Sequence, residues 1–171
     1  MEERIKWWRT NPGGYHAIAG LDRYVNDDSS IEKPLRELVK LRASQINGCA
    51  YCIDMHWKDA REAGESEQRL ALLSAWREAP QYTDRERAAL AWTEALTLIS
   101  QTHAPDDVYE EVRAQFSEME TADLTLAIAT INAWNRMSIS MRAPEAGSYD
   151  PTRRKPAPTP ETTTTKAMAG D

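Results

Sequence analysis

The chain has 171 residues, of which 21 are basic and 27 acidic, and its formal net charge at pH 7 is −6. This length allows one domain with a substantial core, and the negative charge argues against a general affinity for nucleic acid. No apolar run approaches the roughly 20 residues that span a bilayer, and the N-terminus lacks the apolar segment of a secretory signal. We therefore expect a cytoplasmic protein with neither nucleic acid nor membrane as a partner.

The composition favours helices throughout the chain. Ala, Leu, Glu and Arg are abundant, Val and Ile are sparse, and no run alternates with the period of a strand. We predict an all-α fold with a single domain over residues 1–148. Breaks and caps divide this domain into helices. They are Asn11-Pro12-Gly13-Gly14, Asn47-Gly48, the capping box Thr83-x-x-Glu86 and a cap at Thr121. The predicted helices cover residues 3–8, 15–24, 34–47, 50–63, 66–73, 84–98, 105–116 and 122–141.

The composition changes after Ser148. Prolines alternate with Thr, Arg and Lys, and a run of four threonines follows at residues 162–165. Few apolar side chains are available there to offset the entropy of ordering the chain. We predict that residues 149–171 form a disordered tail.

Residues 37–61 hold the most informative pattern in the chain. Both cysteines, Cys49 and Cys52, lie there with C-x-x-C spacing, and His56 follows Cys52 by four residues. On one helix, Cys52 and His56 are neighbours about 5–6 Å apart at Cβ, and the two sulfurs can approach disulfide distance. Glu37 lies on the preceding helix, which the Asn47-Gly48 turn folds back onto the next. We therefore expect Glu37 to orient His56.

This pattern suits thiol chemistry in a reducing compartment, where C-x-x-C is more often redox-active or metal-binding than structural. The helix N-terminus favours a thiolate at Cys49, whereas the histidine partner favours one at Cys52. A zinc site needs more ligands, and His16 and His103 lie far away in the sequence. Covalent haem needs a histidine directly after Cys52, where Ile53 stands. We expect neither a metal nor a cofactor, although two inert buried cysteines remain an alternative.

The combined pattern resembles the core motif of the AhpD-like alkylhydroperoxidases, which belong to the carboxymuconolactone decarboxylase superfamily. The similarity covers about residues 15–142. Between the cysteines the chain has Tyr51, where characterised peroxidases of the family often have histidine. The residues that carry the resemblance are Glu37, Ser44, Asn47, Gly48, Cys49, Tyr51, Cys52, His56, Arg61, Gly64, Glu86, Arg87 and the segment 131–136.

The resemblance implies an AhpD-like helical bundle that assembles by helix packing into a homo-oligomer, either a dimer, a trimer or a hexamer. It implies that Cys52 is the peroxidatic thiol, that His56 deprotonates it through a water, and that Glu37 is the distal base. Cys49 would be the resolving thiol. The partners would be a hydroperoxide substrate and an external dithiol reductant.

We therefore expect an enzyme, a thiol-dependent peroxidase that reduces alkyl hydroperoxides through a thiol–disulfide cycle. The alternatives are a redox sensor or disulfide carrier without turnover, and a cofactor-free lactone decarboxylase. Asn132, Asn135 and Arg136 interrupt the apolar pattern of the last helix, and they could form a hydrogen-bond network, a subunit contact or an active-site wall. The tryptophans could line a peroxide pocket, although core and interface positions are commoner. They are Trp7, Trp8, Trp57, Trp76, Trp92 and Trp134.

Overall fold

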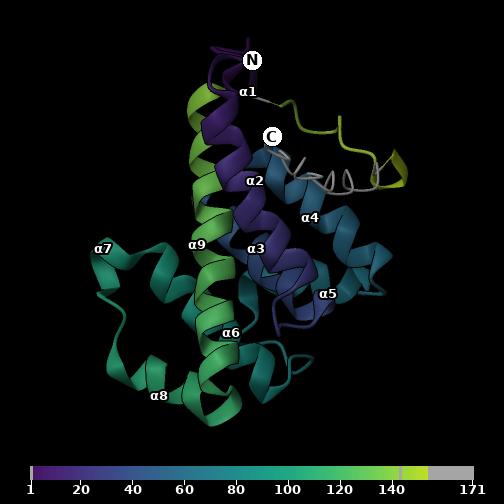
Figure 1. Ribbon diagram of the computed structural model, residues 1–171. Coiled ribbons are helices and arrows are strands. Elements are labelled where there is room, and N and C mark those ends of the chain that lie inside the picture. The colour runs from purple at the N-terminus through teal and green to yellow at the C-terminus, as the bar shows by residue number, and fades with distance from the viewer. Residues whose placement is uncertain (1, 143, 154–171) are drawn as a thin grey trace, which may run out of the picture.

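The computed structural model describes residues 2–142 and 144–153, and the regular elements in these ranges are all helices. The predicted all-α class is therefore confirmed. Figure 1 shows α9 along the length of the molecule with α2 beside it, and α7 and α8 on the opposite side of α9 from α4. The helices are α1 (Trp7–Thr10), α2 (Pro12–Asp27), α3 (Lys33–Asn47), α4 (Ala50–Glu62), α5 (Glu67–Leu72), η1 (Leu73–Ala75), α6 (Asp84–Thr97), α7 (Ile99–Thr102), α8 (Asp106–Gln115), α9 (Glu118–Met141) and η2 (Pro151–Arg153).

Helix α3 lies at the centre of the fold, in contact with α4, α6 and α9. Its Leu35 and Val39 belong to an apolar cluster shared with α6, α8 and α9. Leu38 and Leu41, on another face of the helix, belong to a second cluster with α4, α5 and α6. A helix with apolar residues on two faces is stable only when it is buried on both. Three charged side chains of α3 are buried as well, and these belong to the candidate site.

The turn after α3 sets the position of the cysteines. Gly48 has a φ of 72°, which is the left-handed conformation that glycine adopts without steric cost. The Cys49 N–H donates to Ser44 O at 3.0 Å and closes the end of the helix. The chain returns through this turn, and α4 packs against α3.

The first helices begin at other residues than predicted. We expected a break over residues 11–14, but Asn11 is the N-cap of α2 and its Oδ1 accepts from the Gly14 N–H at 3.0 Å. Pro12 is the first helical residue, where its missing N–H costs nothing. The first helix is α1, at Trp7–Thr10, rather than residues 3–8.

The start of α9 also corrects the prediction. We expected Thr121 to cap this helix, but Ser117 does so and forms a capping box with Glu120. Thr121 lies one turn inside the helix and donates its hydroxyl to Ser117 O at 2.7 Å. The Ser-x-x-Glu signal at residues 117–120 was therefore the stronger one. The short helix α7 was not predicted.

The chain beyond Ser148 is described as far as residue 153. Lys58 Nζ donates to Tyr149 O at 2.9 Å, so this part of the chain lies against α4. The rest of the predicted tail, residues 154–171, lies outside the described residues, and the boundary between domain and tail stays a prediction. In the two described ranges, no helix has both the length and the hydropathy that crossing a bilayer requires.

A buried amide network ties α9 to the end of α3. Asn47 Nδ2 donates to Asn132 Oδ1 at 3.0 Å and to Asn135 Oδ1 at 2.9 Å. Asn135 Nδ2 donates to Ser44 Oγ at 3.1 Å, and Arg136, which is exposed, donates to Asn132. Of the readings open for these residues, the hydrogen-bond network is the one observed. It holds the turn that precedes the cysteines.

We predict that Asn135→Ala lowers the free energy of unfolding by about 2–3 kcal/mol, because it removes two hydrogen bonds from a fully buried site. Urea denaturation measures this change. The control on the same helix is Ile139→Ala, since Ile139 is 46% exposed and its loss should cost less than about 0.5 kcal/mol. Equal effects of the two substitutions would contradict a structural role for the network.

Candidate functional site

The two cysteines meet at the start of α4. Cys49 is the N-cap residue and Cys52 lies in the first turn, and both are buried. They are joined in a disulfide, and their Cα atoms are 5.3 Å apart. This separation is ordinary for a disulfide, so the bond forms with the start of the helix in place. The expected proximity of the two sulfurs is confirmed.

Glu37 and His56 form a buried pair between α3 and α4. His56 Nδ1 lies 2.8 Å from Glu37 Oε2, and both residues are at most 4% exposed. Because a carboxylate accepts at Nδ1, this nitrogen carries the hydrogen, and Nε2 is the atom able to take a proton. His56 Nε2 is buried and has no hydrogen-bond partner among the described residues. The expected contact between the two residues is present.

The electrostatics of the pair favour an ionised acid. Burial by itself would raise the pKa of Glu37, but the hydrogen bond and charge of His56 lower it, and Lys40 and Arg36 act in the same direction. The net result is a pKa of about 2 for Glu37. Glu37 is therefore a carboxylate at neutral pH, and it stabilises the imidazolium that forms when His56 takes a proton.

A cavity of about 840 Å³ opens onto this pair. Cys52, His56 and Glu37 all line it, whereas Cys49 is absent from the described residues of its wall. A molecule in the cavity therefore meets Cys52 first. Tyr51 also lines the wall, and partial burial raises the pKa of its hydroxyl, which favours the neutral phenol.

Aromatic rings form another part of the cavity wall. Trp7, Tyr15 and Trp134 contact one another with ring centroids 5.4–6.0 Å apart. Trp134 also packs against the small cluster that contains both cysteines. Trp7, Trp8 and Trp134 thus line the pocket, which was the less common of the positions considered for the tryptophans, whereas Trp76 belongs to the core. The apolar wall suits an organic group beside the sulfur of Cys52.

Asp59 is a buried acid that the sequence analysis missed. It lies one turn after His56 and accepts a hydrogen bond from the Tyr149 hydroxyl at 2.7 Å. Glu37, His56 and Asp59 each offer a ligand atom within 4.8 Å of the other two. However, Glu37 already binds His56, and Lys40 Nζ lies 3.9 Å from the same carboxylate. With a cation that near, the group suits a proton relay better than a divalent metal ion.

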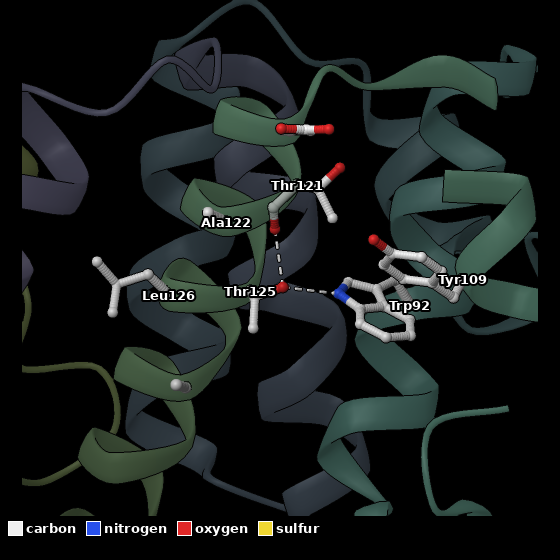
Figure 2. A pocket seen from close by; sticks show the side chains of 8 residues that line it. Trp92, Tyr109, Thr121, Ala122, Thr125 and Leu126 are labelled. Carbon is white, nitrogen blue, oxygen red and sulfur yellow. Dashed lines mark hydrogen bonds between the residues drawn. The ribbon is translucent and has the colours of Figure 1, made fainter. Parts of the chain in front are cut away.

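A second, shallower cavity of about 410 Å³ lies against α6, α8 and α9 (Figure 2). Its wall is mainly apolar, and Trp92 Nε1 donates to Thr125 Oγ1 at 3.0 Å across it. Glu118 is the one acid among its described lining residues, and neither a cysteine nor a histidine is among them. Its described lining therefore offers no group for thiol chemistry.

Comparison with known proteins now adds to this geometry. The model of the carboxymuconolactone decarboxylase family matches residues 12–95. The uncharacterized protein YdfG of Bacillus subtilis is 45% identical over 141 residues, which are 82% of this chain and 95% of YdfG. The chain belongs to the carboxymuconolactone decarboxylase family.

Solved structures refine the position of the chain within the carboxymuconolactone decarboxylase family. An Agrobacterium tumefaciens protein of unknown function, described as a candidate antioxidant defence protein AhpD, is 45% identical with a TM-score of 0.81. The match covers 84% of this chain and 98% of that one, and it supports the AhpD-like branch. The debrominase Bmp8 is 23% identical with a TM-score of 0.71, over 79% of this chain and 72% of Bmp8, and it shares the fold.

We predict that the Glu37 carboxylate makes stability depend on acid pH. Its pKa is lowered from 4.5 to about 2 by folding, so its contribution is complete above pH 4.5 and is lost as the pH falls towards 2. Between pH 5 and pH 2.5 the wild type should lose about 1–3 kcal/mol more free energy of unfolding than Glu37→Gln.

Urea denaturation at a series of pH values measures the difference. The matched control is Glu110→Gln on α8, an exposed acid whose variant should follow the wild-type curve. Parallel curves for the wild type and Glu37→Gln would contradict the ionised pair.

Proposed function

We propose that the protein is a thiol-dependent peroxidase that reduces organic hydroperoxides through Cys49 and Cys52. One observation carries the proposal, the buried hydrogen bond from His56 Nδ1 to Glu37 at the wall of a cavity that Cys52 shares. It orients a base one helical turn from a thiol. A thiolate produced by a neighbouring base is the nucleophile that attack on a peroxide requires.

The first step begins from the reduced pair. His56 Nε2 takes the proton of the Cys52 thiol, directly or through one water, and Glu37 stabilises the imidazolium. The thiolate then attacks the terminal oxygen of the hydroperoxide, so that an S–O bond forms and the O–O bond breaks. Sulfur loses two electrons and becomes a sulfenic acid. The alkoxide leaves and takes the proton that His56 holds, which gives an alcohol.

The second step restores a disulfide. The Cys49 thiol attacks the sulfur of the Cys52 sulfenic acid, an S–S bond forms, the S–O bond breaks, and water leaves with the Cys49 proton. An external dithiol then reduces the disulfide by two thiol exchanges and is itself oxidised to a disulfide. In total, one hydroperoxide and one dithiol give one alcohol, one water and one disulfide.

We also propose the compartment in which the protein works and its oligomeric state. Turnover needs a supply of dithiol, so we place the protein in the cytoplasm, where thiols are kept reduced. We also propose a homo-oligomer built by helix packing, as the family resemblance implies. Light scattering on the purified protein should give the mass of two, three or six chains, and the mass of a single chain would contradict this part of the proposal.

The test is hydroperoxide-dependent oxidation of a dithiol by the wild type, Cys49→Ser and Cys52→Ser. We expect turnover by the wild type alone. In the first cycle, Cys49→Ser should accumulate a sulfenic acid on Cys52 that a carbon nucleophile traps. Full activity in both variants would contradict the proposal, and a trapped sulfenic acid on Cys49 in Cys52→Ser would reverse the two roles.

Two histidine substitutions test the proton transfer from Cys52 to His56. His56→Gln should lower kcat/KM by about 10²–10⁴-fold, because it removes the general base. His103→Gln is the matched control, since His103 lies at the C-terminal end of α7, away from the cavity, and its loss should leave the rate unchanged. An unchanged rate in His56→Gln would remove His56 from the mechanism.

The other functions considered from the sequence predict other results. A disulfide carrier or redox sensor would oxidise once with peroxide and fail to turn over with a dithiol. A lactone decarboxylase would keep full lactone turnover in Cys52→Ala. One zinc per chain in reduced protein would indicate a structural thiolate site.

A further inference from the structure

Arg36 is a buried cation that the proposed mechanism does not use. It lies in the first turn of α3, is 6% exposed, and lines the same cavity as Cys52. Its Nη1 donates to Ile31 O at 3.0 Å, but its Nε is buried and has no hydrogen-bond partner among the described residues. None of the described carboxylates lies within ion-pair distance of Arg36. A buried charge without an ion-pair partner is costly, so its presence needs a reason.

Two features of the start of α3 favour an anion beside Arg36. Lys33, one turn earlier on the helix, also lines the cavity. The positive end of the α3 dipole lies at Lys33 and adds to the same field. An anion is therefore attracted to the end of the cavity at the start of α3.

Lys40 and Asp22 line the cavity too, but both already have hydrogen-bond partners. Lys40 Nζ donates to Asn26 Oδ1 at 2.6 Å and lies 3.9 Å from Glu37. Asp22 accepts from the other side of the same Asn26 amide at 2.9 Å. These three polar groups hold one another, and Arg36 is left as the buried donor with spare capacity.

Arg36 shares its cavity with the residues of the proposed mechanism. Arg36 precedes Glu37, Glu37 binds His56, and His56 is one turn from Cys52. Trp134 and its aromatic neighbours pack beside Cys52. The cavity thus has a buried cation, a thiol and an aromatic wall.

We propose that Arg36 binds the carboxylate of the substrate, which is an organic hydroperoxide bearing a carboxylate on an apolar chain. The inference rests on the proposed peroxidase function and names its substrate class. The Nε–H and one Nη2–H of a guanidinium are parallel donors, which match the two oxygens of a carboxylate. The hydroperoxide group then lies near Cys52 and the apolar part of the chain near the aromatic wall.

The kinetic test compares linoleic acid hydroperoxide with its methyl ester. The wild type should prefer the acid by about 10- to 100-fold in kcat/KM, as one charge-assisted contact allows. Arg36→Gln should lose that preference, because its rate with the acid falls by more than its rate with the ester, whereas Arg36→Lys should keep part of it. Arg61→Gln is the control, because Arg61 is 55% exposed and lies outside the lining of the cavity.

A binding measurement tests the carboxylate site without any need for turnover. Laurate should quench the tryptophan fluorescence of the wild type at a lower concentration than methyl laurate, and Arg36→Gln should bind the two alike. Thermal melting of Arg36→Met checks for a structural role, and we expect a midpoint equal to or above that of the wild type because a buried charge without an ion pair is removed. A lower midpoint would assign Arg36 to the fold.

The two proposals fail in different ways. If the wild type reduces acid and ester equally and binds laurate no better than its ester, the carboxylate site is wrong and the peroxidase stands. If no hydroperoxide is turned over, cumene hydroperoxide included, the peroxidase proposal is wrong. Preferential binding of laurate would then still support Arg36 as a carboxylate site.

Discussion

The hydrogen bond between Glu37 and His56 is the interaction on which the rest of the site depends. It joins α3 to α4, assigns the hydrogen of the imidazole to Nδ1 and leaves Nε2 as the nitrogen able to take a proton. An ionised acid inside a protein costs free energy unless its partners are held in place. The surrounding helices supply that order: the apolar clusters fix α3, and the glycine turn with its amide network fixes the start of α4.

Much of the fold was predictable because composition and caps act locally. The helical class and the end of α3 at Asn47-Gly48 follow from propensity and from the left-handed glycine. The errors concern two helix starts, because a break was predicted at Asn11 and the cap of α9 was placed at Thr121. Asn11 and Ser117 each begin a helix several residues before the predicted start, because Pro12 fits a first turn and Glu120 completes a capping box.

The residues of the candidate site were also predictable only in part. Cys49, Cys52 and His56 lie on one helix, so their spacing alone predicts that they meet, and Glu37 follows from the turn that joins the two helices. Arg36, Asp59 and Tyr149 could not be found from sequence, because their role depends on which face of each helix meets the cavity. Side chains from α2 and from the chain after α9 complete that wall, and no local pattern encodes a contact between residues so distant in sequence.

The most direct measurement of the central claim is the acidity of the Cys52 thiol in reduced Cys49→Ser protein. The rate of alkylation by iodoacetamide, followed against pH, reports the thiolate fraction. The account predicts a midpoint below the ordinary cysteine pKa of about 8.5, which rises when Glu37→Gln or His56→Gln is added to the Cys49→Ser background. A midpoint that is the same in all three proteins would show that the Glu37–His56 pair does not act on Cys52, and the proposed mechanism would be wrong.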